Sequence, residues 1–505
     1  MSAAPPTVAA REGRTSKFAW AVGLTVCHQL IVMCTGLWLT RYLLAEVGAG
    51  TLGWWAQATM LVGYFAVIDL GVSSLLPREL AAAVGRGSGA AEGAEIVARF
   101  SKFALYQLPA AALIGIACVF VLVRLDATTA AVSTAMFAVA VATFPLRVGS
   151  AVLAGLQDVR FVGGFQILVY LSGVAVTVGC VGAGMGVAGI ALGWAVQTLA
   201  GVALVWFRVL RRHRPFMPSV RTVAACRVPG RMFADGGWAW MATVGVGLAA
   251  TAELLVVGWF QPLSAVFQYT CTTKLAVICS PLVLTLCQSA LPGLSELRAS
   301  GDAVGIRRAT AAYAQFILAA SGFFGIVVLA TNGWFIARWV GDAQYLGDTT
   351  TVLSVLGMNA RHAVNVVAVV LFCVNRDRPL WRVTLCDGVL TLGATAAAVW
   401  VAGPTFAPLG SLLVCATFTL PALLSITRAE GSLVLRELLR VPALWAVGYA
   451  AVGVVAVAVA RHSTARAPFS QVGLVGGVAL AYVAFLVVVL RRTPLSAYLS
   501  GLRRR

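Results

Sequence analysis

The sequence predicts an all-α integral membrane protein with about 14 transmembrane helices. Of its 505 residues, 60% are hydrophobic and 11% are charged, whereas soluble domains carry about 25% charged residues. Apolar segments of about 20 residues, the length that crosses a bilayer as a helix, recur along the whole chain. Alternation typical of strands is weak, so helices rather than a β-barrel are expected to satisfy the backbone hydrogen bonds.

The expected spans are continuous apolar segments separated by short polar turns. They cover residues 18–40, 52–76, 103–123, 130–155, 164–183, 187–210, 236–258, 268–291, 309–331, 349–373, 383–403, 407–427, 441–460 and 470–490. We number these segments as spans 1 to 14 in chain order.

The basic residues predict the orientation of the spans. Loops on one side hold only a few, namely Arg41, Arg124, Arg338, Arg461 and Arg466, and the spans themselves hold Arg147, Lys274 and Arg361. All others of the 37 Lys and Arg residues fall on the opposite side. Because cytoplasmic loops carry an excess of Lys and Arg, both termini are expected to be cytoplasmic. Orientation therefore accounts for the net charge of +19, and no nucleic-acid partner is expected.

A long basic segment, residues 211–234, divides the first twelve spans into six and six. Transporters built from such repeats often bind their cargo between the two halves. The expected organisation is a cytoplasmic tail at 1–17, an N-lobe at 18–210, a basic cytoplasmic linker at 211–234, a C-lobe at 235–427, and two further spans with a basic tail at 428–505.

Several short motifs resemble those of a known family. They are Asp69-Leu70-Gly71 with Ser73, Ser74 and Arg78 at the end of span 2, Thr251 to Gly258 around Glu253 in span 7, Tyr269 to Lys274 in span 8, and Trp339 to Asp342 after span 9. These stretches resemble the polysaccharide-exporter branch of the multidrug/oligosaccharidyl-lipid/polysaccharide flippase superfamily. Members of that branch are flippases for lipid-linked oligosaccharide units, such as O-antigen units.

The resemblance implies an inverted V of two six-helix lobes related by a pseudo-twofold axis, which works by alternating access. It implies that a polyprenyl-diphosphate-linked oligosaccharide is moved across the bacterial cytoplasmic membrane for polysaccharide biosynthesis (O-antigen, capsule or exopolysaccharide). Membrane lipids, a polysaccharide polymerase and glycosyltransferases are the partners that this function suggests. Gly184 to Gly189 matches G-x-G-x-x-G, but the match lies in a turn between spans 5 and 6 with no strand before it, so the dinucleotide interpretation fails. No Walker motif or metal-ligand cluster occurs, and we expect no cofactor and no enzyme activity.

Three alternatives remain open. The first is a flippase on the same scaffold whose cargo is a lipid-linked peptidoglycan precursor, which the two additional spans fit. The second is a multidrug exporter on the same scaffold, whose cargo is a drug. The third is a membrane polysaccharide polymerase or glycosyltransferase. Such an enzyme usually needs a sizeable acidic loop, and the loops between these spans are short.

Three cations at bilayer depth are candidate cargo-binding residues: Arg147 in span 4, Lys274 in span 8 and Arg361 in span 10. Arg binds phosphate oxygens bidentately and Lys acts as a point charge, so each suits a diphosphate. The alternative is that they pair with acids and hold helices together. Glu253 is then the natural partner of Lys274, and Arg361 is the strongest cargo candidate.

Three acids in the spans are candidates for coupling transport to an H⁺ or Na⁺ gradient: Glu253, Asp387 and Asp69. Charged groups inside a membrane cost free energy and commonly mark ion pathways. For Asp69 a helix cap beside Gly71 is the competing interpretation. His362, a histidine within an apolar span, is expected to be hydrogen-bonded across helices.

Overall fold

The computed structural model describes residues 8–86, 89–289, 303–373, 377–429, 449–458 and 468–490. These residues form helices joined by short turns, and none of them forms a strand. The contacts within the chain divide it into two compact units, Met1–Trp240 and Met241–Arg505. We call them unit 1 and unit 2 and describe each by itself.

Ten helices among the described residues are long and apolar enough to cross a membrane, and a bent helix pair raises the number to eleven. Two shorter apolar helices, Tyr449–Ala458 and Val475–Val488, follow. The chain is therefore a multi-pass helical membrane protein. The count of 14 crossings, the cytoplasmic termini and the boundaries of the lobes stay predictions, and the expected span 441–460 lies partly outside the described residues.

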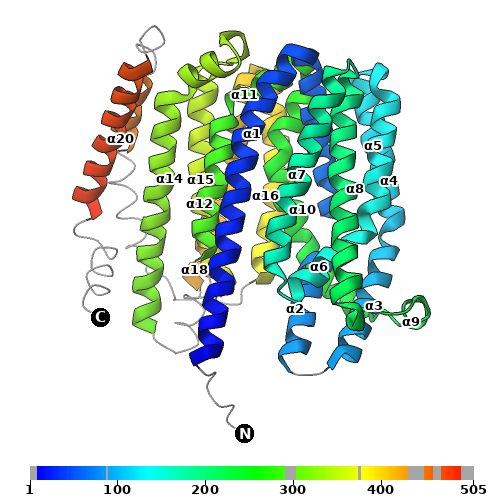
Figure 1. Cartoon of the computed structure of the whole chain (residues 1–505). Helices are drawn as coiled ribbons and strands as arrows, with labels where there is room; N and C mark the ends of the chain where they lie inside the picture. Colours follow the sequence, from blue (N-terminus) through cyan, green and yellow to red (C-terminus); the bar gives the residue numbers. More distant parts are fainter. Residues whose placement is uncertain are drawn as a thin grey trace. The chain divides into compact units, whose positions relative to one another are not determined.

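Unit 1 contains the helices up to the start of α10 (Figure 1). In chain order they are α1 (Val8–Gly63), η1 (Tyr64–Ile68), α2 (Val72–Gly85), α3 (Gly89–Tyr106), α4 (Leu108–Leu125), η2 (Ala127–Thr129), α5 (Ala130–Thr143), η3 (Phe144–Arg147), α6 (Val148–Gly155), α7 (Val159–Gly182), α8 (Gly186–Arg212), η4 (Arg214–Phe216), α9 (Val220–Ala225) and the first part of α10 (Gly230–Phe260).

Helix α1 covers the expected span 18–40 and the first part of the expected span 52–76, and it is interrupted at Gly48. The expected span 52–76 is not one continuous helix, because η1 and the turn at residues 69–71 separate the end of α1 from α2. The backbone there has φ 80° and ψ 169°, a conformation that residues with a Cβ rarely adopt. The turn between the two spans thus depends on glycine at this position.

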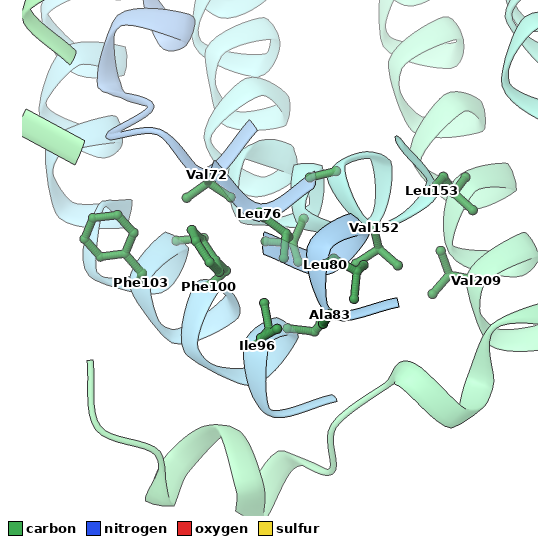
Figure 2. Packing of buried hydrophobic residues seen from close by; sticks show 14 of the residues in the cluster. Val72, Leu76, Leu80, Ala83, Ile96, Phe100, Phe103, Val152, Leu153 and Val209 are labelled. Atoms are coloured by element: carbon green, nitrogen blue, oxygen red, sulfur yellow. The ribbon is translucent and has the colours of Figure 1, made fainter. Parts of the chain in front are cut away.

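A core of aliphatic and aromatic side chains joins α2, α3, α6 and α8 in unit 1 (Figure 2). Val72, Leu76 and Leu80 recur every four residues along one face of α2 and are fully buried, as expected of a helix with one apolar face. They pack with Phe100 of α3 and Val152 of α6, among others. This core fixes α2 directly after the interruption at which Asp69 lies.

Unit 2 contains the remaining helices. They are the rest of α10, α11 (Leu263–Thr272), α12 (Lys274–Ser289), α14 (Ala303–Trp339), η5 (Asp342–Gln344), α15 (Asp348–Cys373), α16 (Asp377–Ala402), η6 (Pro404–Phe406), α17 (Ala407–Val414), the π-helix η7 (Cys415–Thr419), α18 (Leu420–Ala429) and α20 (Pro468–Leu490).

The last apolar helices pack on α14 within unit 2. Tyr449 and Tyr482 belong to one buried cluster with Ile326 and Val328 of α14, and α20 lies beside α14 in Figure 1. The Tyr482 hydroxyl also donates to the Ala319 carbonyl, at 3.3 Å. The described parts of the two additional predicted spans are therefore attached to the body of unit 2.

Candidate functional site

In unit 1 the carboxylate of Asp69 caps a helix. Asp69 lies between η1 and α2, and Gly71 follows with φ +89°. Its two oxygens accept hydrogen bonds from the backbone N–H groups of Val72, at 2.6 Å, and Ser73, at 3.0 Å. A negative charge at a helix N-terminus is stabilised by these donors and by the helix dipole. Asp69 therefore forms the helix cap that the sequence analysis gave as the alternative to a coupling role.

Arg147 approaches this cap from η3, the 3₁₀ turn that contains Pro145. Its Nη2 donates to Oε1 of Gln107 at 2.5 Å and lies 3.4 Å from Oδ1 of Asp69. Its guanidinium carbon is 3.6 Å from the centre of the Phe144 ring. Arg147 therefore forms an ion pair within unit 1, at a place where three helix interruptions meet.

In unit 2 the guanidinium of Arg361 is held by oxygen atoms from two helices, α16 and α17. Nη1 of Arg361 forms an ion pair with Oδ2 of Asp387. Nη2 donates to the Thr391 hydroxyl at 2.9 Å, and Nε donates to the Ser411 hydroxyl at 3.1 Å. Oδ1 of Asp387 accepts a hydrogen bond from the Thr419 hydroxyl at 2.5 Å. Arg361 and Asp387, predicted for two different roles, are thus partners of each other.

The oxygen atoms around Arg361 are deeply buried. The side chain of Asp387 is 4% exposed and that of Arg361 is 22% exposed, and Thr391, Ser411 and Thr419 are all buried. Thr419 ends the π-helix η7, and such local widening of a helix is frequent at functional sites. We call Asp387, Thr391, Ser411 and Thr419 the oxygen cage of Arg361.

Glu253 on α10 lies close to this cage. Its carboxylate accepts a hydrogen bond from the hydroxyl of Tyr269 on α11, and Tyr269 is 3% exposed. Arg361 is close enough to Glu253 for their charges to interact. The two residues form no ion pair with each other in the described part of the chain. Of the three candidate coupling acids, Glu253 is the one whose described contacts include no ion pair.

Lys274 begins α12, immediately after a bend of 50° between α11 and α12. Its side chain is partly exposed. Within the described part of the chain its ammonium has no hydrogen bond and no carboxylate partner. The pairing of Lys274 with Glu253, the alternative to a cargo role, is not found among the described residues; the Glu253 carboxylate accepts a hydrogen bond from Tyr269 on α11.

A separate hydrogen-bonded chain surrounds His362 in the core of unit 2. Nε2 of His362 lies 3.0 Å from the Ser280 hydroxyl, and Nδ1 lies 2.6 Å from the Ser321 hydroxyl. Ser321 donates to Asn359, and Asn359 donates to the Tyr449 hydroxyl. The prediction that His362 is hydrogen-bonded across helices is confirmed. These hydrogen bonds also link the helix of Tyr449 to α14 and α15.

Sequence inspection overlooked several residues of these sites. They are Gln107, Tyr269, Thr391, Ser411 and Thr419. Each is a neutral polar residue in an otherwise apolar segment, and that is the one signal that marks them. The cargo and coupling roles of Arg147, Lys274, Arg361, Glu253, Asp387 and Asp69 remain predictions.

Comparison with known proteins identifies the fold. No family model matches the sequence, and no curated protein matches it. The structure is similar to that of the lipid II flippase MurJ in an inward closed conformation, with a TM-score of 0.66 and 9% identity over 93% of this chain and 99% of that chain.

Two MATE transporter structures are also similar. One is a point mutant of VcmN from Vibrio cholerae, with a TM-score of 0.54 and 14% identity over 83% of this chain and 98% of that chain. The other is an inward-facing multidrug resistance MATE transporter of the MOP superfamily, with a TM-score of 0.55 and 14% identity over 80% of this chain and 96% of that chain. At these identities the similarity establishes the fold alone, which this chain shares with the MurJ structure and the two MATE structures.

Proposed function

We propose that this protein is a flippase that moves a polyprenyl-diphosphate-linked oligosaccharide repeat unit across the bacterial cytoplasmic membrane by alternating access. Polysaccharide biosynthesis is the process that such a repeat unit serves, with a polymerase and glycosyltransferases as partners. The fold supports transport, because the three solved structures described above are a flippase and two transporters.

The observation that carries the proposal is Lys274. A cation within a membrane span costs free energy unless it has a partner, and no described residue supplies a carboxylate to Lys274. It lies at a bend between two helices, and interrupted helices are where many transporters bind their cargo. A phosphate oxygen supplies the negative charge that the ammonium lacks.

Arg361 and Arg147 follow Lys274 as cargo-binding residues in this proposal. Both form ion pairs, with Asp387 and Asp69 respectively, so a phosphate has to compete with a carboxylate for either guanidinium. Glu253 is the residue through which we propose that an H⁺ or Na⁺ gradient drives export.

The second candidate is a lipid-linked peptidoglycan precursor as the cargo. The MurJ structure aligns with 93% of this chain, whereas the two MATE structures align with 83% and 80%. The chain also continues beyond α18 into apolar helices that pack on α14. The two candidate cargoes differ in the glycan attached to the diphosphate. Measuring the transport rate of each cargo by the same protein therefore distinguishes the two functions.

Reconstitution into liposomes tests the proposal. Fluorescent polyprenyl-diphosphate oligosaccharide and fluorescent lipid-linked peptidoglycan precursor are incorporated separately, and the leaflet of the label is followed by quenching. Lys274→Met removes the charge and keeps an apolar side chain of similar length, and it is expected to lower transport at least tenfold. Lys274→Arg is expected to retain most of it. Arg338→Gln, the loss of an exposed charge, serves as the control.

The possible results separate the candidates. Faster transport of the oligosaccharide supports the polysaccharide assignment, and faster transport of the peptidoglycan precursor favours the second candidate. If folded Lys274→Met transports as well as the wild type, the ammonium is not the cargo site. Sugar transfer in the vesicles without transport rejects a flippase altogether.

A further inference from the structure

The basic linker, residues 211–229, joins two apolar helices at the place where the first of them ends. The preceding helix α8 is long and apolar enough to cross a membrane up to Arg212, and the apolar part of α10 begins at Trp240. On the last turns of α8 the apolar side chains of Phe207 and Leu210 are 54% and 52% exposed. The linker therefore begins at the depth where an apolar helix leaves the hydrocarbon and the lipid headgroups start.

The linker is held against α3 within unit 1 (Figure 1). The ring of Phe216 lies on α3 where Gly93 leaves room for it, since a Cβ at Gly93 would stand 2.5 Å from Cδ1 of Phe216. At the end of α9, Nζ of Lys102 donates to the carbonyl oxygens of Ala224, at 2.7 Å, and Cys226, at 2.8 Å. These contacts keep α9 beside the end of α3, so its outward side has a fixed position.

The outward side of the linker carries an unbalanced positive charge. Residues 211–229 contain no Asp or Glu. The nearby carboxylate of Asp158 is already engaged by Arg208 and His213. In the part of the chain that the structure describes, none of the exposed arginines of the linker forms an ion pair. They are Arg211, Arg212, Arg214, Arg221 and Arg227.

An apolar side chain projects from the same surface. Val220 begins α9 next to Arg221 and is 87% exposed, although valine is usually buried. Exposed apolar residues among basic ones are typical of segments that lie in the plane of a membrane surface. There the apolar side chain enters the acyl boundary while the basic side chains reach the headgroups.

We propose that this surface, the five exposed arginines with Val220, binds the headgroups of anionic phospholipids in the adjacent leaflet. Charge complementarity favours this occupant, because the phosphodiester of phosphatidylglycerol carries a net negative charge and phosphatidylcholine carries none. Arg also binds phosphate oxygens bidentately. Each basic side chain beside an anionic membrane strengthens the attachment about fivefold. The inference concerns lipids that stay in their leaflet and does not depend on which cargo the protein moves.

The first experiment counts bound lipids. Native mass spectrometry is applied to the purified protein in detergent micelles with equal amounts of phosphatidylglycerol and phosphatidylcholine. The wild type is expected to retain phosphatidylglycerol preferentially, and less so at high ionic strength, because salt screens exposed charges. Arg221→Gln together with Arg227→Gln is expected to lower the preference at least about fivefold. Equal retention of both lipids by the wild type overturns the inference.

A matched control separates this surface from the net charge of the protein. Arg124→Gln together with Arg338→Gln removes the same charge from two exposed arginines outside the linker, and it is expected to retain the preference for phosphatidylglycerol. If the control loses as much of the preference as the linker variant, the linker is not the binding surface. All four side chains are exposed, so both double variants are expected to melt with the wild type in detergent without added lipid.

The second experiment identifies what lies on the surface. Val220→p-benzoylphenylalanine, in an otherwise unchanged chain, is illuminated in liposomes of phosphatidylglycerol and phosphatidylcholine, and mass spectrometry identifies the products. We expect lipid adducts in which phosphatidylglycerol exceeds its share of the liposome at least about fivefold, with the excess lost when Arg221→Gln and Arg227→Gln are added. Adducts to a second copy of the chain, or no lipid adducts, contradict the proposal. Should the combined variant fail to fold, the adducts of the single substitution still decide.

The same crosslink distinguishes a resident lipid from cargo. Polyprenyl diphosphate is added to the liposomes at the concentration of the phosphatidylglycerol. We expect the phosphatidylglycerol adducts to persist. Their replacement by polyprenyl-diphosphate adducts would assign this surface to the cargo and reject a resident phospholipid. Because no transport is measured, the outcome is independent of whether the flippase function is confirmed.

Discussion

Removing the carboxylate of Asp387 is expected to destabilise unit 2 by about 3 kcal/mol. Breaking a buried ion pair from one side costs about 3–5 kcal/mol, because the remaining charge is left without compensation. In Asp387→Ala the guanidinium of Arg361 keeps its bonds to Thr391 and Ser411, and its side chain is 22% exposed. These features place the cost in the lower part of that range. The lost bond from Thr419 adds about 0.6 kcal/mol, the average for hydrogen bonds within membranes.

The double variant isolates the interaction from the cost of the unpaired charge. Arg361→Met together with Asp387→Ala removes both charges, so it is expected to be more stable than the sum of the single changes predicts. The coupling energy between the two positions is expected to be about 2 kcal/mol or more. Unfolding by sodium dodecyl sulfate in mixed micelles, followed by tryptophan fluorescence, measures each variant.

An exposed acid of the same unit provides the control. Asp342 lies at the start of η5 and is exposed, so Asp342→Ala is expected to change stability by less than about 0.5 kcal/mol. The reasoning fails if Asp387→Ala has the same free energy of unfolding as the wild type. It also fails if the destabilisation of the double variant equals the sum of the destabilisations of the two single variants. Either result would mean that the pair seen in the structure contributes no net interaction.

Two further predictions concern packing and pH. Gly410→Ala places a Cβ 2.5 Å from the Cα of Thr395, so it is expected to lower the stability of the protein by about 1–3 kcal/mol. Gly393→Ala is the control, because its Cβ meets nothing within 4 Å. A thermal melt is expected to show that this control is neutral or slightly stabilising. Burial raises the pKa of the Asp158 carboxyl, but hydrogen bonds from Arg208 and His213 together lower it more. The pKa of Asp158 therefore lies below its ordinary value. This carboxylate therefore stabilises the fold above the unfolded pKa of about 3.9, and the contribution disappears as the pH falls through the folded pKa. The melting temperature of the wild type is expected to exceed that of Asp158→Asn at neutral pH and to converge on it in acid, and a constant difference contradicts the assignment.

Local features of the sequence were sufficient to locate most of the long apolar helices among the described residues. An apolar segment of about 20 residues forms a helix in a membrane because its backbone groups have no other hydrogen-bond partners there. One interruption was anticipated in the same way: the cap expected beside Gly71 is present, and Gly71 takes a positive φ value. The interruption at Gly48 was not predicted, although its positive φ value also requires glycine. These preferences act within a few residues and can be inferred from the order of the residues.

The partners of the charged residues could not be inferred in this way. Arg361 and Asp387 are 26 residues apart and meet because α15 and α16 pack together. Lys274 and Glu253 appeared well matched in charge and spacing, yet Tyr269 takes the carboxylate. The sequence shows that ionisable groups lie at bilayer depth, but not which helix face each one occupies.

The sequence by itself determined that the chain is a helical membrane protein, where most of its described apolar helices lie and which ionisable residues they contain. Those properties follow from hydropathy and backbone preference, which are local. Only the tertiary structure decided that Asp69 caps α2 beside Arg147, that oxygens from α16 and α17 hold Arg361, and that Lys274 lacks a carboxylate partner among the described residues. Such pairings depend on helix rotation and crossing, which arise from packing between segments far apart in the chain.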